Sequence, residues 1–270
     1  MTIPWITVED LTIEEKQASG KTRVLVDHVS FTIEQGEVLG LIGESGSGKS
    51  LTMKALMGLL PKNLTVTMKT FTVDGQPVSD PTKLPFTMIF QDPMTSLDPV
   101  FTIGEHLEEV IARFQAQDPI KINQQAIAML DHVGIPNPEK VLTQYPHELS
   151  GGMQQRVMIG MALLTHSKLL IADEPTTALD VTIQKQILQL MRQLQMEQAL
   201  TLVIVSHDFG VIAGMSDRVD VMYQGRIIEE NTTDQLFNHP QHAYTKQLLQ
   251  SAELSNRSEE GHHDNKHTVH

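Results

Sequence analysis

A loop rich in glycine and serine holds the first residues whose types and spacing could do chemistry. The run Gly43-Glu44-Ser45-Gly46-Ser47-Gly48-Lys49-Ser50 matches the pattern G-x-x-x-x-G-K-[ST]. Its glycines let backbone N–H groups turn inward around a phosphate, while Lys49 supplies a charge for the β- and γ-phosphates and Ser50 a hydroxyl for Mg²⁺. A chance match is the alternative. The apolar run 38–42 before the loop and the helical run 51–57 after it favour a phosphate site.

Two adjacent carboxylates form the second candidate group. Asp173 and Glu174 follow the apolar run 169–172, which is typical of a buried strand. The carboxyl ends of parallel strands are where such sheets bind ligands, so we expect Asp173 to hold Mg²⁺ and Glu174 to polarise an attacking water. An ordinary acidic loop is the alternative, and the phosphate loop elsewhere in the chain argues against it.

A third motif lies between these two, in the run Leu149-Ser150-Gly151-Gly152-Met153-Gln154-Gln155-Arg156. Ser150 has the character of an N-cap, and the helix behind it would offer free N–H groups to a phosphate. With this motif the sequence resembles the ATP-binding subunit of ABC transporters, whose signature reads L-S-G-G-Q. The resemblance implies that Ser150, Gly151, Gly152 and Gln154 complete the ATP site of a second subunit.

The same resemblance implies roles for three more residues. Gln91 matches the family's Q-loop, which touches Mg²⁺ or the lytic water, so Gln91, Glu174 and His207 are the implied catalytic residues. His207 matches the histidine that contacts the γ-phosphate. Asp180, in the run 178–180, matches a loop at the dimer interface. Ser50, Gln91 and Asp173 are the implied Mg²⁺ ligands. The sequence departs from the family upstream of the phosphate loop, where no aromatic residue stands to stack on adenine, although Arg23 offers a planar guanidinium.

Three further runs, at residues 91–99, 171–182 and 239–249, narrow the resemblance to the branch that imports oligopeptides, dipeptides or nickel. Membership implies two membrane-spanning permease subunits, an extracytoplasmic binding protein and a second ATP-binding subunit, commonly a different chain. It also implies a place at the cytoplasmic face of the cell membrane. Peptide-importing members of the branch often carry a longer C-terminal extension with cysteines, and this chain has no cysteine and no such extension. The difference favours nickel or a metal chelate as the cargo and does not exclude a peptide.

The surrounding elements must position these motifs. The first ninety residues are mostly strand-like, with one β-like stretch over 66–73, whereas apolar residues at 103–114 and 122–133 recur at helical spacing. Strands and helices alternate after residue 150, as in a parallel sheet. We expect an α/β P-loop NTPase core over 1–93 and 165–250 with an antiparallel β subdomain, an inserted helical signature subdomain over 94–164, and a disordered His-rich tail over 251–270.

Composition limits the alternatives. The 270 residues include 40% hydrophobic and 20% charged residues, and no apolar run approaches the roughly 18–20 residues that span a bilayer. The net charge of −13 argues against nucleic acid as a partner. A soluble ABC ATPase acting on ribosomes or DNA therefore fits less well than a transport ATPase. A metal-binding module centred on the tail stays open, with His262, His263, His267 and His270 as its ligands.

Overall fold

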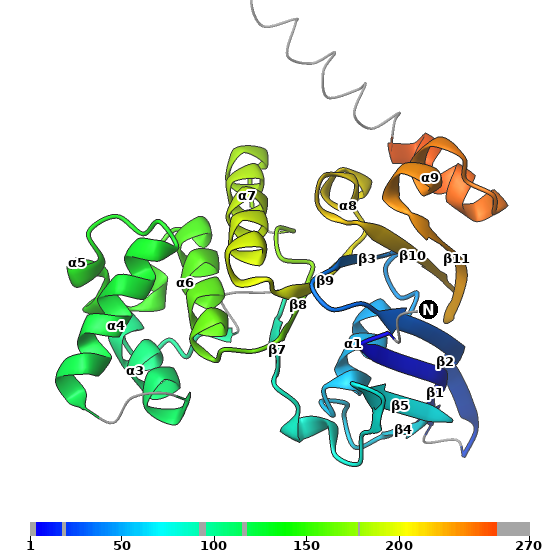
Figure 1. Ribbon diagram of the computed structural model, residues 1–270, viewed down its shortest axis with the longest axis horizontal. Helices are drawn as coiled ribbons and strands as arrows, with labels where there is room; N and C mark the ends of the chain where they lie inside the picture. The colour runs from blue at the N-terminus through cyan, green and yellow to red at the C-terminus, as the bar shows by residue number, and fades with distance from the viewer. Residues whose placement is uncertain (1–3, 18–19, 92–95, 115–117, 178, 253–270) are drawn as a thin grey trace, which may run out of the picture.

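The computed structural model describes residues 4–17, 20–91, 96–114, 118–177 and 179–252. Figure 1 shows a lobe of helices beside a central sheet, with a second sheet on the other side. The predicted α/β core with an antiparallel subdomain and a helical insertion is confirmed. Among the described residues, none of the helices combines the length and the apolar composition that crossing a membrane requires.

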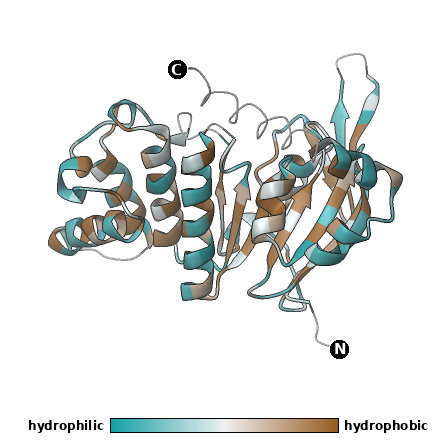
Figure 2. Ribbon diagram, turned by 90° about the horizontal axis from the view of Figure 1, so that it is seen from above, coloured by the Kyte–Doolittle hydropathy of each residue, from teal (hydrophilic) through white to brown (hydrophobic). Residues whose placement is uncertain are grey.

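The central sheet has the strand order β11-β10-β3-β9-β8-β7, and all neighbouring strands are parallel except the pair β10 and β11. Its strands are β3 (Val38–Ile42), β7 (Phe86–Ile89), β8 (Leu169–Asp173), β9 (Thr201–Ser206), β10 (Arg218–Tyr223) and β11 (Arg226–Thr232). Every residue of β3, β8 and β9 is buried. These strands are apolar throughout because protein covers both faces of the sheet. Figure 2 shows this as hydrophobic colour along the central strands.

The second sheet is antiparallel and covers one face of the central sheet together with α1 (Lys49–Leu56). Its strands are β1 (Ile6–Lys16), β2 (Thr22–Ile33), β4 (Leu64–Thr67), β5 (Thr70–Val73) and β6 (Gln76–Pro77). The single stretch predicted over 66–73 is wrong, since β4 and β5 pair with different parts of β1. The apolar positions change phase between Met68 and Phe71, and one strand could not keep both sets on the same face.

The helical lobe lies between β7 and β8 in the chain and contains the two helices predicted from apolar spacing. Its helices are α3 (Ile103–Phe114), α4 (Pro119–His132), α5 (Pro138–Leu142) and α6 (Gly151–Leu164). One cluster of buried apolar side chains runs from this lobe into the face of the central sheet that α7 (Val181–Gln198) and α8 (Phe209–Met215) also cover. The lobe therefore shares its core with the sheet.

The C-terminal part adds α9 (Thr233–Asn238) and a further helix over residues 243–252. This helix includes residues 251 and 252, the first two residues of the predicted tail over 251–270. Residues 253–270, with the four histidines, lie outside the described residues. No group of three or more metal-ligating side chains occurs in the part of the chain that the structure does describe.

Candidate active site

The phosphate loop connects β3 to α1, as its sequence predicts. Gly43 has φ 157 and Gly48, the N-cap of α1, has φ 108, which are values that other residues rarely adopt. A Cβ atom at Gly43 would lie 2.1 Å from the carbonyl oxygen of Met222, and one at Gly48 would lie 2.8 Å from the Met222 side chain. Glycine is therefore required at both positions by the close approach of β10.

Lys49 is buried beneath this loop and holds it from inside. Its ammonium donates hydrogen bonds to the carbonyl oxygens of Gly43, at 2.7 Å, and Glu44, at 2.9 Å. Burial lowers the pKa of Lys49, and the negative charges of Glu174 and Asp173 act in the opposite direction. A phosphate at the loop would supply the anionic partner that favours the charged ammonium.

Asp173 is the last residue of β8 and lies beside the first turn of α1. The Ser50 hydroxyl donates a hydrogen bond of 2.7 Å to Asp173 Oδ1. Burial raises the pKa of Asp173, against the effect of this hydrogen bond and of the nearby lysines. The structure thus brings together Ser50 and Asp173, two of the residues expected to ligate Mg²⁺.

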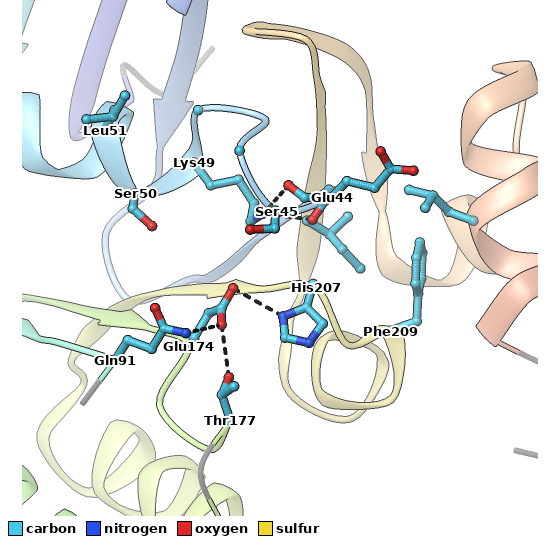
Figure 3. A pocket seen from close by; sticks show the side chains of 15 residues that line it. Glu44, Ser45, Lys49, Ser50, Leu51, Gln91, Glu174, Thr177, His207 and Phe209 are labelled. Atoms are coloured by element: carbon cyan, nitrogen blue, oxygen red, sulfur yellow. Dashed lines mark hydrogen bonds and ion pairs between the residues drawn. The ribbon is translucent and has the colours of Figure 1, made fainter. Parts of the chain in front are cut away.

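Glu174 is the centre of a hydrogen-bonded group drawn from three strand ends (Figure 3). Gln91 Nε2 and Thr177 Oγ1 donate to Glu174 Oε2 at 2.8 and 3.0 Å, and His207 Nδ1 lies 3.1 Å from Glu174 Oε1. Gln91, Glu174 and His207 follow the neighbouring strands β7, β8 and β9, so the parallel sheet itself places them together.

The backbone of Glu174 is strained. Its φ of 50 lies in the left-handed region, which costs a residue other than glycine about 1 kcal/mol or more. The strain persists because the Glu174 N–H donates to the Val205 carbonyl at 2.8 Å and three side chains contact its carboxylate. Such conformations are typical of functional positions.

A cavity of about 560 Å³ joins the loop to the Glu174 group. Its lining includes the loop residues Gly43 to Ser50 except Ser47, together with Gln91, Glu174, Thr177 and His207. Phe209 and Leu248 also line it, and sequence reasoning missed both, as it missed Thr177. Thr177 had a local signal, because threonine three residues after a carboxylate can reach back to it. Phe209 and Leu248 had none.

The signature residues lie away from this cavity, and none of residues 150–154 is among the described residues that line it. Ser150 is the N-cap of α6, as predicted, and its Oγ accepts from the Met153 N–H at 3.4 Å. Met153 occupies the fifth position of L-S-G-G-Q in this chain, and Gln154, the next residue, faces inward, in contrast to the role expected for it. It is only 5% exposed, and its amide donates to the Pro146 carbonyl at 2.7 Å, so it stabilises the turn before α6 in its own chain.

Gly152 and Asp180 also have roles within the chain. A Cβ at Gly152 would lie 2.6 Å from the Ile183 side chain, so glycine lets α6 approach α7. Asp180 is the N-cap of α7, where its carboxylate accepts from the N–H groups of Thr182 and Ile183 at 3.0 Å each. Ala178, in the same loop, lies outside the described residues.

Comparisons with known proteins bear on the family of this chain. The family model described as ABC transporter matches residues 26–177. The oligopeptide transport ATP-binding protein OppD of Bacillus subtilis is 44% identical over 255 residues, covering 91% of this chain and 71% of OppD. The peptidoglycan transport ATP-binding protein YejF of Agrobacterium fabrum is 46% identical over 257 residues, covering 92% of this chain. The glutathione import ATP-binding protein GsiA of Escherichia coli K12 is 45% identical over 258 residues, covering 90% of this chain.

The chain spans 47% of the length of YejF and 41% of the length of GsiA. The names of these three relatives refer to oligopeptide, peptidoglycan and glutathione as substrates, so nickel cargo, which the sequence favoured, has no specific support.

Solved structures show the same fold. A dimer of the ATP-binding cassette MJ0796, in a post-hydrolysis state with ADP and phosphate, has a TM-score of 0.73 at 26% identity, covering 84% of this chain and 98% of that one. The cbiO1 protein of Clostridium perfringens, part of the transporter complex cbiONQ, has a TM-score of 0.72 at 26% identity, covering 88% of this chain and 92% of that one. From these matches, the chain belongs to the ATP-binding proteins of ABC transporters, in the family of the oligopeptide, dipeptide and glutathione importers.

Proposed function

We propose that this chain energises the import of di- or oligopeptides, including small peptides such as the tripeptide glutathione, handed over by an extracytoplasmic binding protein. It works with a second ATP-binding subunit, a different chain, and with two permease subunits, at the cytoplasmic face of the membrane. The observation that carries the ATPase role is the convergence of Gln91, Thr177 and His207 on Glu174 in the cavity that also holds Lys49. The names of the relatives support the peptide cargo.

The residues beside the loop fit a magnesium ion. Mg²⁺ prefers hard oxygen ligands and is usually held by one or two protein groups plus substrate phosphates. Ser50 and Asp173 present a hydroxyl and a carboxylate 2.7 Å apart, and both Ser50 and Gln91 line the cavity. When bound with ATP, Mg²⁺ would offset the negative charge of the phosphates.

Hydrolysis follows from the placement of the side chains. Glu174 accepts a proton as the water oxygen bonds to the γ-phosphorus and the bond from that phosphorus to the ADP oxygen breaks. His207, Gln91 and Thr177 hold the Glu174 carboxylate in one orientation, and Lys49 stabilises the phosphate charge. Because Gln91 bonds directly to Glu174, a displacement of the segment after β7 would also move the catalytic base.

That segment lies next to a groove between the core and the helical lobe, of about 230 Å³, whose lining includes Phe90, Leu97, Val110 and Met158. We propose that a permease subunit docks here and that the lobe, residues 94–164, moves against the core formed by 1–93 and 165–250. Met94 lies outside the described residues. Leu97 is only 1% exposed, so a charged residue there would disturb the core and is a poor test of docking.

Phe90, which lines the groove and is 40% exposed, gives a sharper test of the whole function. We expect cells lacking this chain to lose uptake of a labelled dipeptide, and the wild-type gene to restore it. Phe90→Glu should restore less than about a tenth of the uptake, because a charge would be buried at the docking surface. ATP turnover by the isolated Phe90→Glu subunit should stay unchanged.

Tyr145→Glu is the matched control, since Phe90 and Tyr145 are both aromatic and both 40% exposed, and Tyr145 is not among the described residues that line the groove. Full uptake with Phe90→Glu would contradict the docking surface. Loss of nickel uptake with unchanged dipeptide uptake in the cells lacking the chain would contradict the cargo.

The signature residues should act on the opposite subunit's ATP. We expect Ser150→Ala to lower ATP hydrolysis at least about tenfold, because a hydroxyl that contacts the transferred phosphate is lost. ATP affinity of a dilute monomeric sample should change less than about twofold. Gly152 is unsuitable for this test because any side chain there would strike Ile183 in the same chain.

Loss of a helix cap alone must be separated from loss of the phosphate contact. Asp118→Ala provides that control, since Asp118 caps α4 in the same lobe and its carboxylate accepts from the Ile120 N–H at 3.1 Å. The proposal that Ser150 acts on the opposite subunit's ATP is wrong if Asp118→Ala lowers hydrolysis as much as Ser150→Ala. It is also wrong if Ser150→Ala weakens ATP binding by the monomer.

A further inference from the structure

The helix over residues 243–252 lies against the phosphate loop, although 200 residues separate the two in the chain. Tyr244 is buried at the start of this helix, and its hydroxyl accepts a hydrogen bond of 3.2 Å from the Glu44 N–H. Leu248, one helical turn later, lines the cavity that contains Lys49. The helix therefore contacts the loop through one polar and one apolar side chain.

The Tyr244 contact falls on a peptide group that also touches Lys49. The Glu44 N–H and the Gly43 carbonyl belong to one planar peptide unit, in which they point in opposite directions. The Gly43 carbonyl accepts from Lys49 at 2.7 Å, and the Glu44 N–H donates to Tyr244. Lys49 and Tyr244 thus hold opposite edges of the same plane. If the Tyr244 contact were lost, this plane could rotate and the Lys49 ammonium would lose a fixed partner.

The core of the protein in turn holds Tyr244 in place. Its ring packs on that of Tyr223, at the end of β10, with ring centroids 4.0 Å apart. Ahead of the helix, the Glu229 carboxylate accepts from the N–H groups of Gln241 and His242 at 2.7 and 3.0 Å. Burial opposes ionisation of Glu229, but these hydrogen bonds outweigh it and lower the pKa of that carboxyl. The start of the helix is therefore anchored by charge-assisted bonds at ordinary pH.

We propose that Tyr244 is a positioning residue for the ATP site. It fixes the Gly43–Glu44 peptide plane so that the Lys49 ammonium is directed at the phosphates, and the helix 243–252 is part of the nucleotide-binding structure. The inference rests on the proposed role of the loop and Lys49 in binding ATP. Loss of the Tyr244 hydroxyl weakens ATP binding and leaves the chemical step, which depends on Glu174, nearly unchanged.

The test compares Tyr244→Phe with Tyr223→Phe in the full chain. Each variant removes one hydroxyl from the same pair of stacked rings, but the Tyr223 hydroxyl accepts from Gln224 at 3.0 Å instead of contacting the loop. Tyr244→Phe should raise the Kd for ATP and the KM about fivefold, a loss typical of one buried hydrogen bond, with kcat within about twofold. Amide exchange over residues 43–49 should accelerate. Tyr223→Phe should leave the affinity and the exchange as in the wild type.

Lys49→Ala is measured in the same assays, and three outcomes would contradict the positioning role of Tyr244. If Lys49→Ala weakens ATP binding but Tyr244→Phe and Tyr223→Phe show the same affinity for ATP and the same amide exchange over residues 43–49, the positioning role is overturned. A Tyr244→Phe variant that loses kcat and thermal stability together at unchanged affinity also overturns it, since Tyr244 would then act only on the fold. If Lys49→Ala binds ATP as well as the wild type, the proposed site itself fails, and the role of Tyr244 with it.

Discussion

Replacing Glu174 with glutamine is expected to lower ATP turnover by about 100- to 10,000-fold, the usual contribution of a general base. Glutamine keeps the length and shape of the side chain but cannot take up the proton of the attacking water. ATP should still bind with an affinity within about threefold of the wild type, because Lys49 and the loop are unchanged. Turnover is measured as phosphate release, and affinity with a fluorescent ATP analogue.

Asp208→Asn is the matched control for this experiment. Asp208 follows His207 directly and caps α8, where its carboxylate accepts from the Gly210 N–H at 2.7 Å. Asparagine is an equally good N-cap, so this variant removes a negative charge near the site while keeping the local structure. Its turnover should stay within about threefold of the wild type. A Glu174→Gln protein that turns over at the parental rate would show that another group is the base.

The second large effect is expected for Lys49→Ala, which should weaken ATP binding by about 10- to 100-fold. This range corresponds to the loss of a hydrogen bond to a charged group. The stability of the nucleotide-free protein should change little, because the penalty of burying the Lys49 charge disappears together with its hydrogen bonds to the Gly43 and Glu44 carbonyls. The increase in Tm that ATP causes in the wild type should be nearly absent in the variant.

Lys54→Ala provides the comparison, since Lys54 lies on the same short helix and carries the same charge but does not line the cavity. It should keep the full ATP-dependent increase in Tm. An equal reduction in both variants would mean that the effect is one of overall charge. An unchanged ATP-dependent increase in Lys49→Ala would exclude this lysine from the phosphate site.

The sequence alone determined the local features of the site. The phosphate loop, the strand that ends in Asp173 and Glu174, and the N-cap at Ser150 were all predicted from residues that are neighbours in the chain. Their geometry depends on glycine conformations, on capping and on the alternation of apolar residues, which act over a few residues. For the same reason the helices 103–114 and 119–132 were recognisable before the fold was known.

Only the tertiary structure decided what these features contact. The order β7-β8-β9 places Gln91 and His207 on either side of Glu174, and no single stretch of sequence encodes that order. Gln154, one residue beyond the signature's glutamine position, turns inward, because the Pro146 carbonyl is the partner within reach of its amide. Tyr244 reaches the loop because the path of β10, β11 and α9 returns the chain to it. Such contacts join segments up to 200 residues apart and depend on the packing of all the elements between them, which is why local patterns could not predict them.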